Sequence, residues 1–195
     1  MTGSWNAIAT GGVDLLADTG SVNVRRGTVD DVAAIARHRA SMFVEIGSAA
    51  PDLAADLEFR TRTYLQEAMP RGEYVAWLAY LEREATTIVA GAGVQMRRKL
   101  PFPRGRVDGT AEIGSGREAI VLNVYTEPGY RRRGVARRLM FEILAWAKSV
   151  DLESLVLHAA PDGRRLYESL GFAATNEMRF AGDLSNWQPG GDGSR

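Results

Sequence analysis

The residues whose types and spacing most clearly suggest a binding site lie between positions 125 and 136, which read YTEPGYRRRGVA. An apolar run before this stretch and a helical apolar spacing after it predict a strand, a tight turn and a helix start. The first N–H groups of a helix lack internal acceptors, and the helix dipole is positive at that end. A phosphate there would be stabilised by backbone donors, with Gly134 letting the backbone approach. The alternative is an ordinary helix start with a solvated basic face, and this argument alone leaves both open.

The stretch also resembles the acetyl-CoA signature of the GNAT superfamily of N-acetyltransferases, which is Arg or Gln, two residues, Gly, one residue, then Gly or Ala. Arg131, Gly134 and Ala136 occupy these positions. A second motif, LYESLGF at residues 166–172, matches the family's later helix with its Tyr and its Leu-Gly-Phe ending. The order of elements is similar over about residues 22–180, whereas the specific motifs lie within 119–172.

The resemblance implies an α+β fold with a GNAT-like mixed, mostly antiparallel sheet that is flanked by helices. The sheet would be splayed between two central strands, 119–125 and 154–158, with acetyl-CoA in the opening as acyl donor. In the family, the strand before the signature contacts the pantetheine arm, and N–H groups of the signature loop hold the pyrophosphate. The matching strand residues are Val124, Tyr125 and Thr126, and the matching loop residues are Arg132, Arg133, Gly134, Val135, Ala136 and Arg137. Backbone donors near the strand residues could also stabilise a tetrahedral oxyanion.

Tyr167 matches the position of the family's usual general acid. Coenzyme A leaves as a thiolate, and a thiol has a pKa of about 8.5 against about 10 for a phenol, so proton delivery from tyrosine is not strongly uphill. The alternative is an aromatic residue that packs in the core with Leu166 and Leu170.

The sequence departs from the family pattern at two places. Many members carry an Asn that contacts the cofactor seven residues before the Tyr, where this chain has Ala160. Many also place a Glu base on one of the two splayed strands, yet no carboxylate lies within 119–122 or 154–157. The base is therefore unassigned. The candidates are Glu118, His158, Glu45 and a water relay to bulk solvent, and each side chain also has a structural or solvated explanation. We expect His38 to be exposed and His158 to be buried.

Other patterns in the sequence are weaker. Residues 114–119 match GxGxxA by letters, but a loop precedes them and a strand follows, so a dinucleotide site is excluded. The basic residues of the loop 97–117 could bind nucleic acid, flank the acceptor site or meet the adenosine phosphates, but a solvated hairpin loop is favoured. In the family, the first two helices line the acceptor pocket. Here that region is 42–57, where Glu45 and Asp52 could attract an ammonium group.

Composition limits the class of protein. The chain has 195 residues with 24 basic and 24 acidic side chains, so its formal net charge is zero and nucleic-acid or membrane partners are not expected. It has no cysteine and only two histidines, which excludes a cysteinyl acyl-enzyme and disfavours a metal site. No signal peptide or membrane-spanning stretch is evident, so we expect a cytoplasmic protein.

The periodicity predicts a flexible N-terminal extension at 1–20, one domain at 21–187 and a disordered tail at 188–195. Thr28 and Asp31 predict a capping box before the first helix, and the second helix should turn Leu53 and Tyr64 inward. The expected elements are strands at 22–26, 74–81, 87–96, 119–125, 154–158 and 172–180, and helices at about 32–46, 52–69, 134–150 and 162–170.

These features together predict transfer of an acetyl group from acetyl-CoA to a primary amine of an unidentified acceptor, by direct attack in a ternary complex. The alternative is a non-catalytic module of the same fold that binds acyl-CoA as a regulatory ligand. A homodimer could form through an exposed strand edge near the last strand.

Overall fold

The computed structural model describes residues 21–105, 109–178 and 180. The chain forms two compact units, Met1–His158 and Ala159–Arg195. The predicted extension at 1–20 and tail at 188–195 lie outside the described residues, and the domain limits of 21 and 187 stay a prediction.

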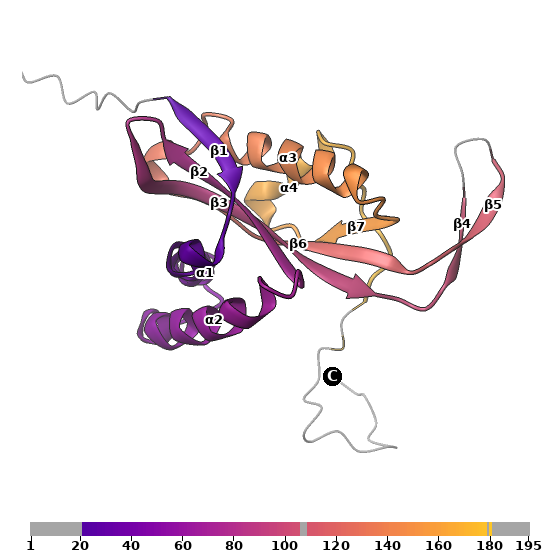
Figure 1. Ribbon diagram of the computed structural model, residues 1–195, viewed down its shortest axis with the longest axis horizontal. Coiled ribbons are helices and arrows are strands. Elements are labelled where there is room, and N and C mark those ends of the chain that lie inside the picture. The colour runs from indigo at the N-terminus through magenta and orange to yellow at the C-terminus, as the bar shows by residue number, and fades with distance from the viewer. Residues whose placement is uncertain (1–20, 106–108, 179, 181–195) are drawn as a thin grey trace, which may run out of the picture. The chain divides into compact units, whose positions relative to one another are not determined.

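A five-stranded sheet organises the first unit, with the strand order β1-β2-β3-β6-β7 (Figure 1). Its neighbouring strands are antiparallel except for the parallel pair β6 and β7, so the predicted mixed, mostly antiparallel α+β fold is confirmed. The strands are β1 (Val22–Arg26), β2 (Tyr74–Leu81), β3 (Glu84–Arg98), β6 (Arg117–Thr126) and β7 (Ser154–Leu157).

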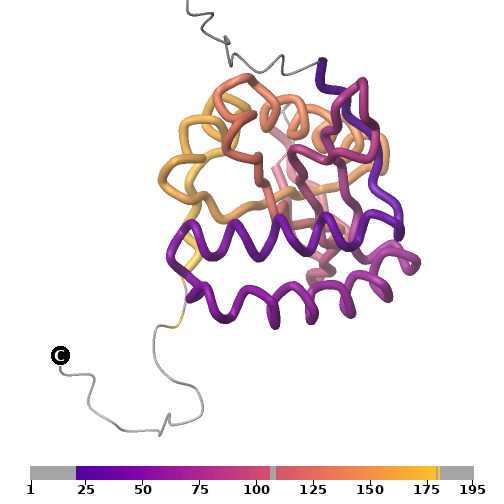
Figure 2. The backbone as a smooth tube through the Cα atoms, turned by 90° about the vertical axis from the view of Figure 1, so that its left-hand side faces the viewer, coloured from indigo at the N-terminus to yellow at the C-terminus, as the bar shows by residue number. Residues whose placement is uncertain are grey.

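Helices cover both faces of this sheet. Helices α1 (Val32–Glu45) and α2 (Ala54–Ala68) run side by side on one face, and α3 (Val135–Ser149) covers the other (Figures 1 and 2). Short 3₁₀ helices, Val29–Asp31 and Pro51–Leu53, lead into α1 and α2. The backbone N–H of Thr28 donates to the Asp31 carboxylate at 2.8 Å, so the predicted capping interaction starts the first of them.

Apolar side chains fill the space on both sides of the sheet. Leu139, Met140 and Ile143 of α3 are fully buried, as their helical spacing predicts, and Trp146 packs edge-on against Trp77 at 5.3 Å between ring centroids. The core below α1 and α2 is built from Val32, Ile35, Leu65, Ala68, Tyr74, Ala76, Leu78 and Ile88. The prediction that Leu53 and Tyr64 point inward is wrong: Leu53 precedes α2 and is 53% exposed, and Tyr64 is 45% exposed.

The predicted splay lies between β6 and β7. Their pairing runs from Glu118 opposite Ser154 to Val121 opposite Leu157 and then stops, while β6 continues to Thr126. Asn123 has a left-handed φ of 56°, and the register against β3 shifts between Gly91 and Gly93. This bulge bends β6 just beyond the point where its pairing with β7 ends.

The region 97–117 differs from the predicted loop. β3 extends to Arg98, and the chain then forms an antiparallel ribbon of β4 (Phe102–Gly105) and β5 (Ala111–Gly114), which projects from the sheet in Figure 1. Prolines are tolerated in such an isolated ribbon because few of its N–H groups need a partner. Lys99 pairs with Glu118 and Arg104 with Glu112, so acidic neighbours balance part of the basic charge.

The second unit contains a 3₁₀ turn, Pro161–Gly163, and the short helix α4 (Arg164–Glu168). Gly171, with a φ of 91°, ends this helical segment, and the N–H of Phe172 donates to the Tyr167 carbonyl at 3.0 Å. The prediction of a strand at 172–180 is wrong for the described residues 172–178 and 180, because they form no ladder with a partner strand. Among the described strands, β7 and β1 are the edges of the sheet.

Candidate functional site

The loop between β6 and α3 has the geometry of an anion site. Pro128–Tyr130 forms a 3₁₀ turn, and left-handed backbone follows at Arg132 (φ 62°) and Gly134 (φ 78°). The N–H of Arg138 makes the first helical hydrogen bond, to the Gly134 carbonyl at 3.0 Å. The preceding N–H groups of α3 therefore have no intrahelical acceptor and point out of the positive end of the helix dipole.

All the predicted loop residues, Arg132 to Arg137, come together at this helix start. Val135 is buried and anchors the first turn, whereas Gly134 and its flanking arginines are exposed. A Cβ at Gly134 would meet no atom within 4 Å. Glycine is therefore favoured here by the left-handed backbone conformation and not by a neighbouring atom that leaves no room for a side chain.

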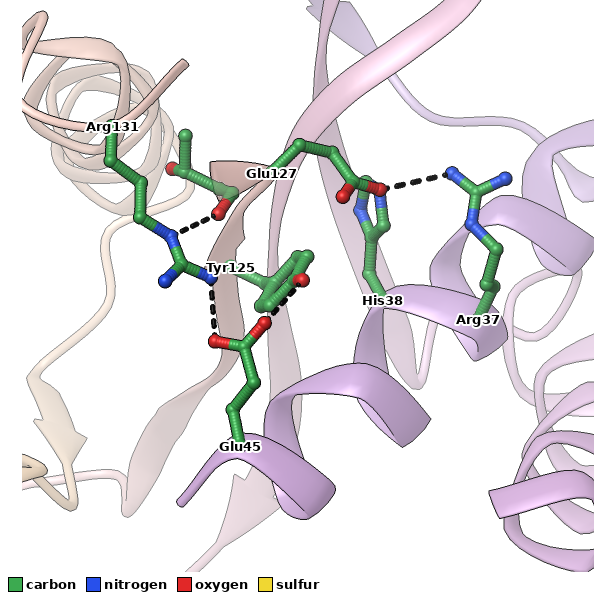
Figure 3. A network of polar contacts seen from close by, with 7 residues as sticks. Arg37, His38, Glu45, Tyr125, Glu127 and Arg131 are labelled. Atoms are coloured by element: carbon green, nitrogen blue, oxygen red, sulfur yellow. Dashed lines mark hydrogen bonds and ion pairs between the residues drawn. The ribbon is translucent and has the colours of Figure 1, made fainter. Parts of the chain in front are cut away.

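Arg131 is already bonded within the protein and connects the elements around the loop. Its Nε donates to the Thr126 carbonyl at 2.8 Å, and its Nη2 pairs with Glu45 Oε2 at 2.6 Å (Figure 3). The Tyr125 hydroxyl donates to the other oxygen of Glu45 at 2.8 Å. These bonds join the end of α1, the end of β6 and the loop, and they occupy both oxygens of Glu45. Burial and the Glu45 carboxylate raise the pKa of Tyr125 to about 12.

Two further candidate bases, Glu118 and His158, lie on β6 and directly after β7. Glu118 is buried between Lys99 and Ser154, whose hydroxyl donates to it at 3.0 Å. It lies seven residues before Tyr125 on β6, which is roughly 23 Å along a strand. His158 is exposed, so the prediction that it is buried is wrong.

His38 is buried, contrary to the prediction of an exposed histidine. Its exposed fraction is 1%, and its ring lies 5.1 Å from that of Tyr125 between centroids. Its Nε2 lies 3.2 Å from Glu127 Oε1, which Arg37 also contacts at 3.4 Å (Figure 3). The missed signal is helical spacing, since His38 follows the buried Ile35 by three positions. Sequence reasoning also missed Glu127.

His38 lines a cavity of about 10 Å³ together with Tyr74 and Asn123, and its second ring nitrogen, Nδ1, is buried without a hydrogen-bond partner among the described residues. That volume suits one water molecule with polar partners. Burial lowers the pKa of His38 to about 4, and the Arg37 cation acts in the same direction, so the ring is neutral at pH 7. Arg37 Nη2 also lies 3.3 Å from Nε2, so the contacts of Nε2 fit either neutral tautomer. In the tautomer that donates Nε2–H to Glu127, Nδ1 carries the lone pair and can accept a proton.

The shifted pKa of His38 makes a prediction about stability. The unfolded pKa is 6.5 and the folded value is about 4, so the stabilising contribution of neutral His38 is complete above pH 6.5 and is lost as the pH falls through 4. Between pH 7 and 4.5 this loss is on the order of 2 kcal/mol. Urea unfolding at pH 7 and 4.5 should show that the free energy of unfolding falls less for His38→Gln than for the wild type. An equal loss in both proteins would contradict a depressed pKa.

A larger cavity of about 310 Å³ lies between α2 and the sheet. It meets the bulge of β6 at Leu122 and Asn123, directly before the predicted strand residues Val124 to Thr126. The acidic lining expected from Glu45 and Asp52 is absent from it: neither residue borders the cavity, and its charged side chains are Arg39 and Arg60.

Tyr167 lies on α4 in the second unit. Its ring packs edge-on against Phe172, 6.1 Å away between centroids, and burial raises the pKa of its hydroxyl. Within that unit Tyr167 is therefore protonated at neutral pH and half-buried, which suits both an acid and a packing residue.

The family model for the acetyltransferase (GNAT) family matches residues 34–172. The chain belongs to this family. No curated protein matches the sequence. Among the described residues, no helix is both long and apolar enough to cross a bilayer, and no group of three or more His, Asp and Glu side chains is arranged to hold a metal ion.

Solved structures of the family have the same fold. A GCN5-related N-acetyltransferase from Ralstonia eutropha is 27% identical with a TM-score of 0.70, and the match covers 82% of this chain and 97% of that one. A predicted acetyltransferase from Clostridium acetobutylicum, solved with acetyl-CoA, is 22% identical with a TM-score of 0.67, over 86% and 100% of the two chains. A ribosomal-protein-alanine N-acetyltransferase from Brucella melitensis is 20% identical with a TM-score of 0.55, over 82% and 99%. The last two matches, at 22% and 20% identity, show a shared fold.

Proposed function

We propose that this GNAT protein transfers the acetyl group of acetyl-CoA to a primary amine, by direct attack within a ternary complex. The observation that carries the proposal is the course of the chain from Tyr125 to Val135. β6, whose pairing with β7 ends at Val121, leads into left-handed backbone and an open helix start. Such a start binds pyrophosphate oxygens through backbone N–H groups. The presence of acetyl-CoA in the Clostridium acetobutylicum structure supports the same donor.

The free edge of β6 is where the pantetheine arm would lie. Beyond Val121 the strand has lost its pairing with β7, so Val124, Tyr125 and Thr126 border the splay. An extended amide-containing arm can take the place of a strand there. A backbone donor at the bulge would face the thioester carbonyl and stabilise the oxyanion that forms on attack.

In this reaction the amine nitrogen bonds to the thioester carbon and the C–S bond breaks. The nitrogen gives up a proton, and the coenzyme A thiolate takes one. Tyr167 is the proposed donor of the second proton on the strength of its position in the LYESLGF motif.

For the first proton we propose a route through His38. Tyr74 and Asn123 border both the large cavity and the small one that His38 lines. A proton reaching Nδ1 by way of one water molecule would be matched by release of the Nε2 proton to Glu127. That carboxylate is one-third exposed and can return the proton to solvent. His38 relays the proton in this route and does not touch the amine.

His38→Gln tests the relay, because glutamine keeps a donor for Glu127 but has no basic nitrogen. At pH 7 kcat should fall by about 100-fold. Near pH 9.5 more of the amine is already neutral, so the difference in kcat between His38→Gln and wild type should fall to less than about tenfold. A second variant, Gly91→Ala, retains His38 but places a methyl group 3.4 Å from Nδ1 and 3.1 Å from Leu78 Cδ2. Once urea unfolding shows that it is folded, its kcat should depend on pH as that of His38→Gln does. A loss that is equal at all pH values would make His38 a structural residue only.

Titration calorimetry with acetyl-CoA, followed by turnover assays with a panel of amines, tests the function itself. The expected outcome is micromolar-class binding and release of coenzyme A that depends on an amine. Binding without turnover of any amine would favour the alternative, a regulatory acyl-CoA-binding module. A wild-type protein that does not bind acetyl-CoA would contradict both.

A further inference from the structure

The 310 Å³ cavity beside the bulge of β6 has the size of a small-molecule site. Leucine side chains supply much of its apolar wall. The polar residues that border it are Arg39, Arg60, Thr61, Tyr64, Tyr74, Gln95 and Asn123. Its lining therefore combines apolar area with hydrogen-bond donors and two cations, and it contains no carboxylate.

Arg39 is the unusual member of this lining. Its guanidinium is half-buried, and burial lowers its pKa. It donates to Asn123 Oδ1 and lies over the ring of Phe43, 4.7 Å from the centroid, and both partners are neutral. Among the described residues it forms no ion pair with a carboxylate. A half-buried cation is stabilised when an anion comes close, so this position lacks a counter-charge that a ligand can supply.

Arg60 differs from Arg39 although it borders the same cavity. It is mostly exposed and pairs with Asp56 at 2.8 Å, one turn away on α2. Its charge is already balanced and screened by solvent, so it contributes little to anion binding. The two arginines thus provide a matched pair for an experiment.

The position of the cavity links it to acetyl transfer. Leu122 and Asn123 form its wall, and the strand residues proposed to hold the thioester follow immediately. A ligand held by Arg39 would lie against the bulge, near the splay of the sheet. An acidic lining would attract any ammonium compound, whereas a lining with arginines selects amines that also carry negative charge.

We propose that the acceptor is a small primary amine that carries an anionic oxyacid group, a carboxylate or a phosphate, and that Arg39 binds this group. The proposal rests on the acetyltransferase function for the role of the amine, but the anion site itself does not depend on it. A guanidinium offers paired N–H donors that match two oxygens of either group.

The test compares amines in pairs that differ in the anionic group. The probes are L-phenylalanine with L-phenylalaninamide, and O-phosphoethanolamine with ethanolamine. In wild type, kcat/KM should be at least about tenfold higher for the anionic member of one pair, and the pair that responds identifies carboxylate or phosphate as the group. Equal values within both pairs would overturn the proposal.

Arg39→Gln removes the charge and keeps a donor for Asn123, so the bulge should be retained. KM for the preferred anionic probe should rise by about 10- to 100-fold, while kcat/KM for its neutral partner stays within about threefold. Arg60→Gln is the control and should change neither value by more than about threefold. A uniform loss for charged and neutral probes in Arg39→Gln would mean that the residue is structural, and the proposal would fall.

Binding without acetyl transfer separates this proposal from the proposed function. Calorimetry of the anionic probes, in the absence of acetyl-CoA, should show binding to wild type and to Arg60→Gln that Arg39→Gln loses. That result with no turnover would retain the anion site and reject the acetyltransferase function. Turnover without any dependence on Arg39 would retain the function and reject the anion site.

Discussion

Replacing Gly134 with aspartate is expected to weaken acetyl-CoA binding by at least about 100-fold while the protein stays folded. The new carboxylate would lie at the start of α3, beside the N–H groups that have no intrahelical acceptor. Those are the donors proposed for the pyrophosphate, and the added negative charge would repel phosphate oxygens. Loss of several charge-assisted hydrogen bonds amounts to about 3 kcal/mol or more, which is a 100-fold change in Kd.

Gly72→Asp is the matched control for this variant. Gly72 is also exposed and left-handed, with a φ of 69° against 78° at Gly134, and a Cβ at either position would meet no atom within 4 Å. Both substitutions therefore carry the same backbone strain, on the order of 1–2 kcal/mol. Calorimetry should show wild-type affinity for Gly72→Asp. If Gly134→Asp also retained that affinity, the pyrophosphate would have to lie elsewhere.

Much of the first unit could be predicted because its sequence signals are local. Val135, Leu139 and Ile143 repeat at helical spacing, and the structure buries all three on the sheet. The apolar run before Tyr125 predicted a central strand, and β6 does lie between β3 and β7. The apolar spacing after Gly134 predicted a helix start, and α3 does begin at Val135. The left-handed backbone of Gly134 itself was not predicted.

The features that could not be predicted from the sequence depend on contacts between distant segments. His38 lies on the buried face of α1 with Ile35, but it is polar and stands between two arginines. Its packing against Gly91 and Tyr125 could not be read from the sequence. The strand predicted at 172–180 needed an edge to pair with, and local sequence cannot supply one. The ribbon of β4 and β5 was missed for the opposite reason, because its prolines obscured two short strands that pair with each other.

The cavity proposed for the acceptor illustrates the same limit for the chemistry of the site. Glu45 was an obvious acidic candidate for attracting an ammonium group. Both of its oxygens are instead bonded, to Tyr125 and Arg131, which lie about 80 residues further along the chain. Arg39 belongs to no sequence motif, and the role proposed for it rests on its half-buried charge beside Asn123. Charges can be counted in a sequence, but which of them are already neutralised depends on the fold.

Tyr167→Phe is expected to lower kcat by about 100-fold or more, with the Kd for acetyl-CoA within about threefold of wild type. The phenol would protonate the departing thiolate, an interaction that develops only in the transition state, so its loss affects turnover more than ground-state binding. Burial raises the pKa of Tyr167, which keeps the proton on the hydroxyl at neutral pH as a general acid requires.

The alternative for Tyr167 is packing, and the phenylalanine variant separates the two roles. The edge-on contact with Phe172 uses the ring and not the hydroxyl, so Tyr167→Phe keeps it and should leave the free energy of unfolding nearly unchanged. Tyr80→Phe, on β2 beside Arg25, controls for removal of a tyrosine hydroxyl and should have wild-type kcat. Steady-state kinetics at saturating acetyl-CoA and amine measures the effect. An unchanged kcat for Tyr167→Phe would leave the tyrosine as a packing residue, and the thiolate would then leave unprotonated or take its proton from water.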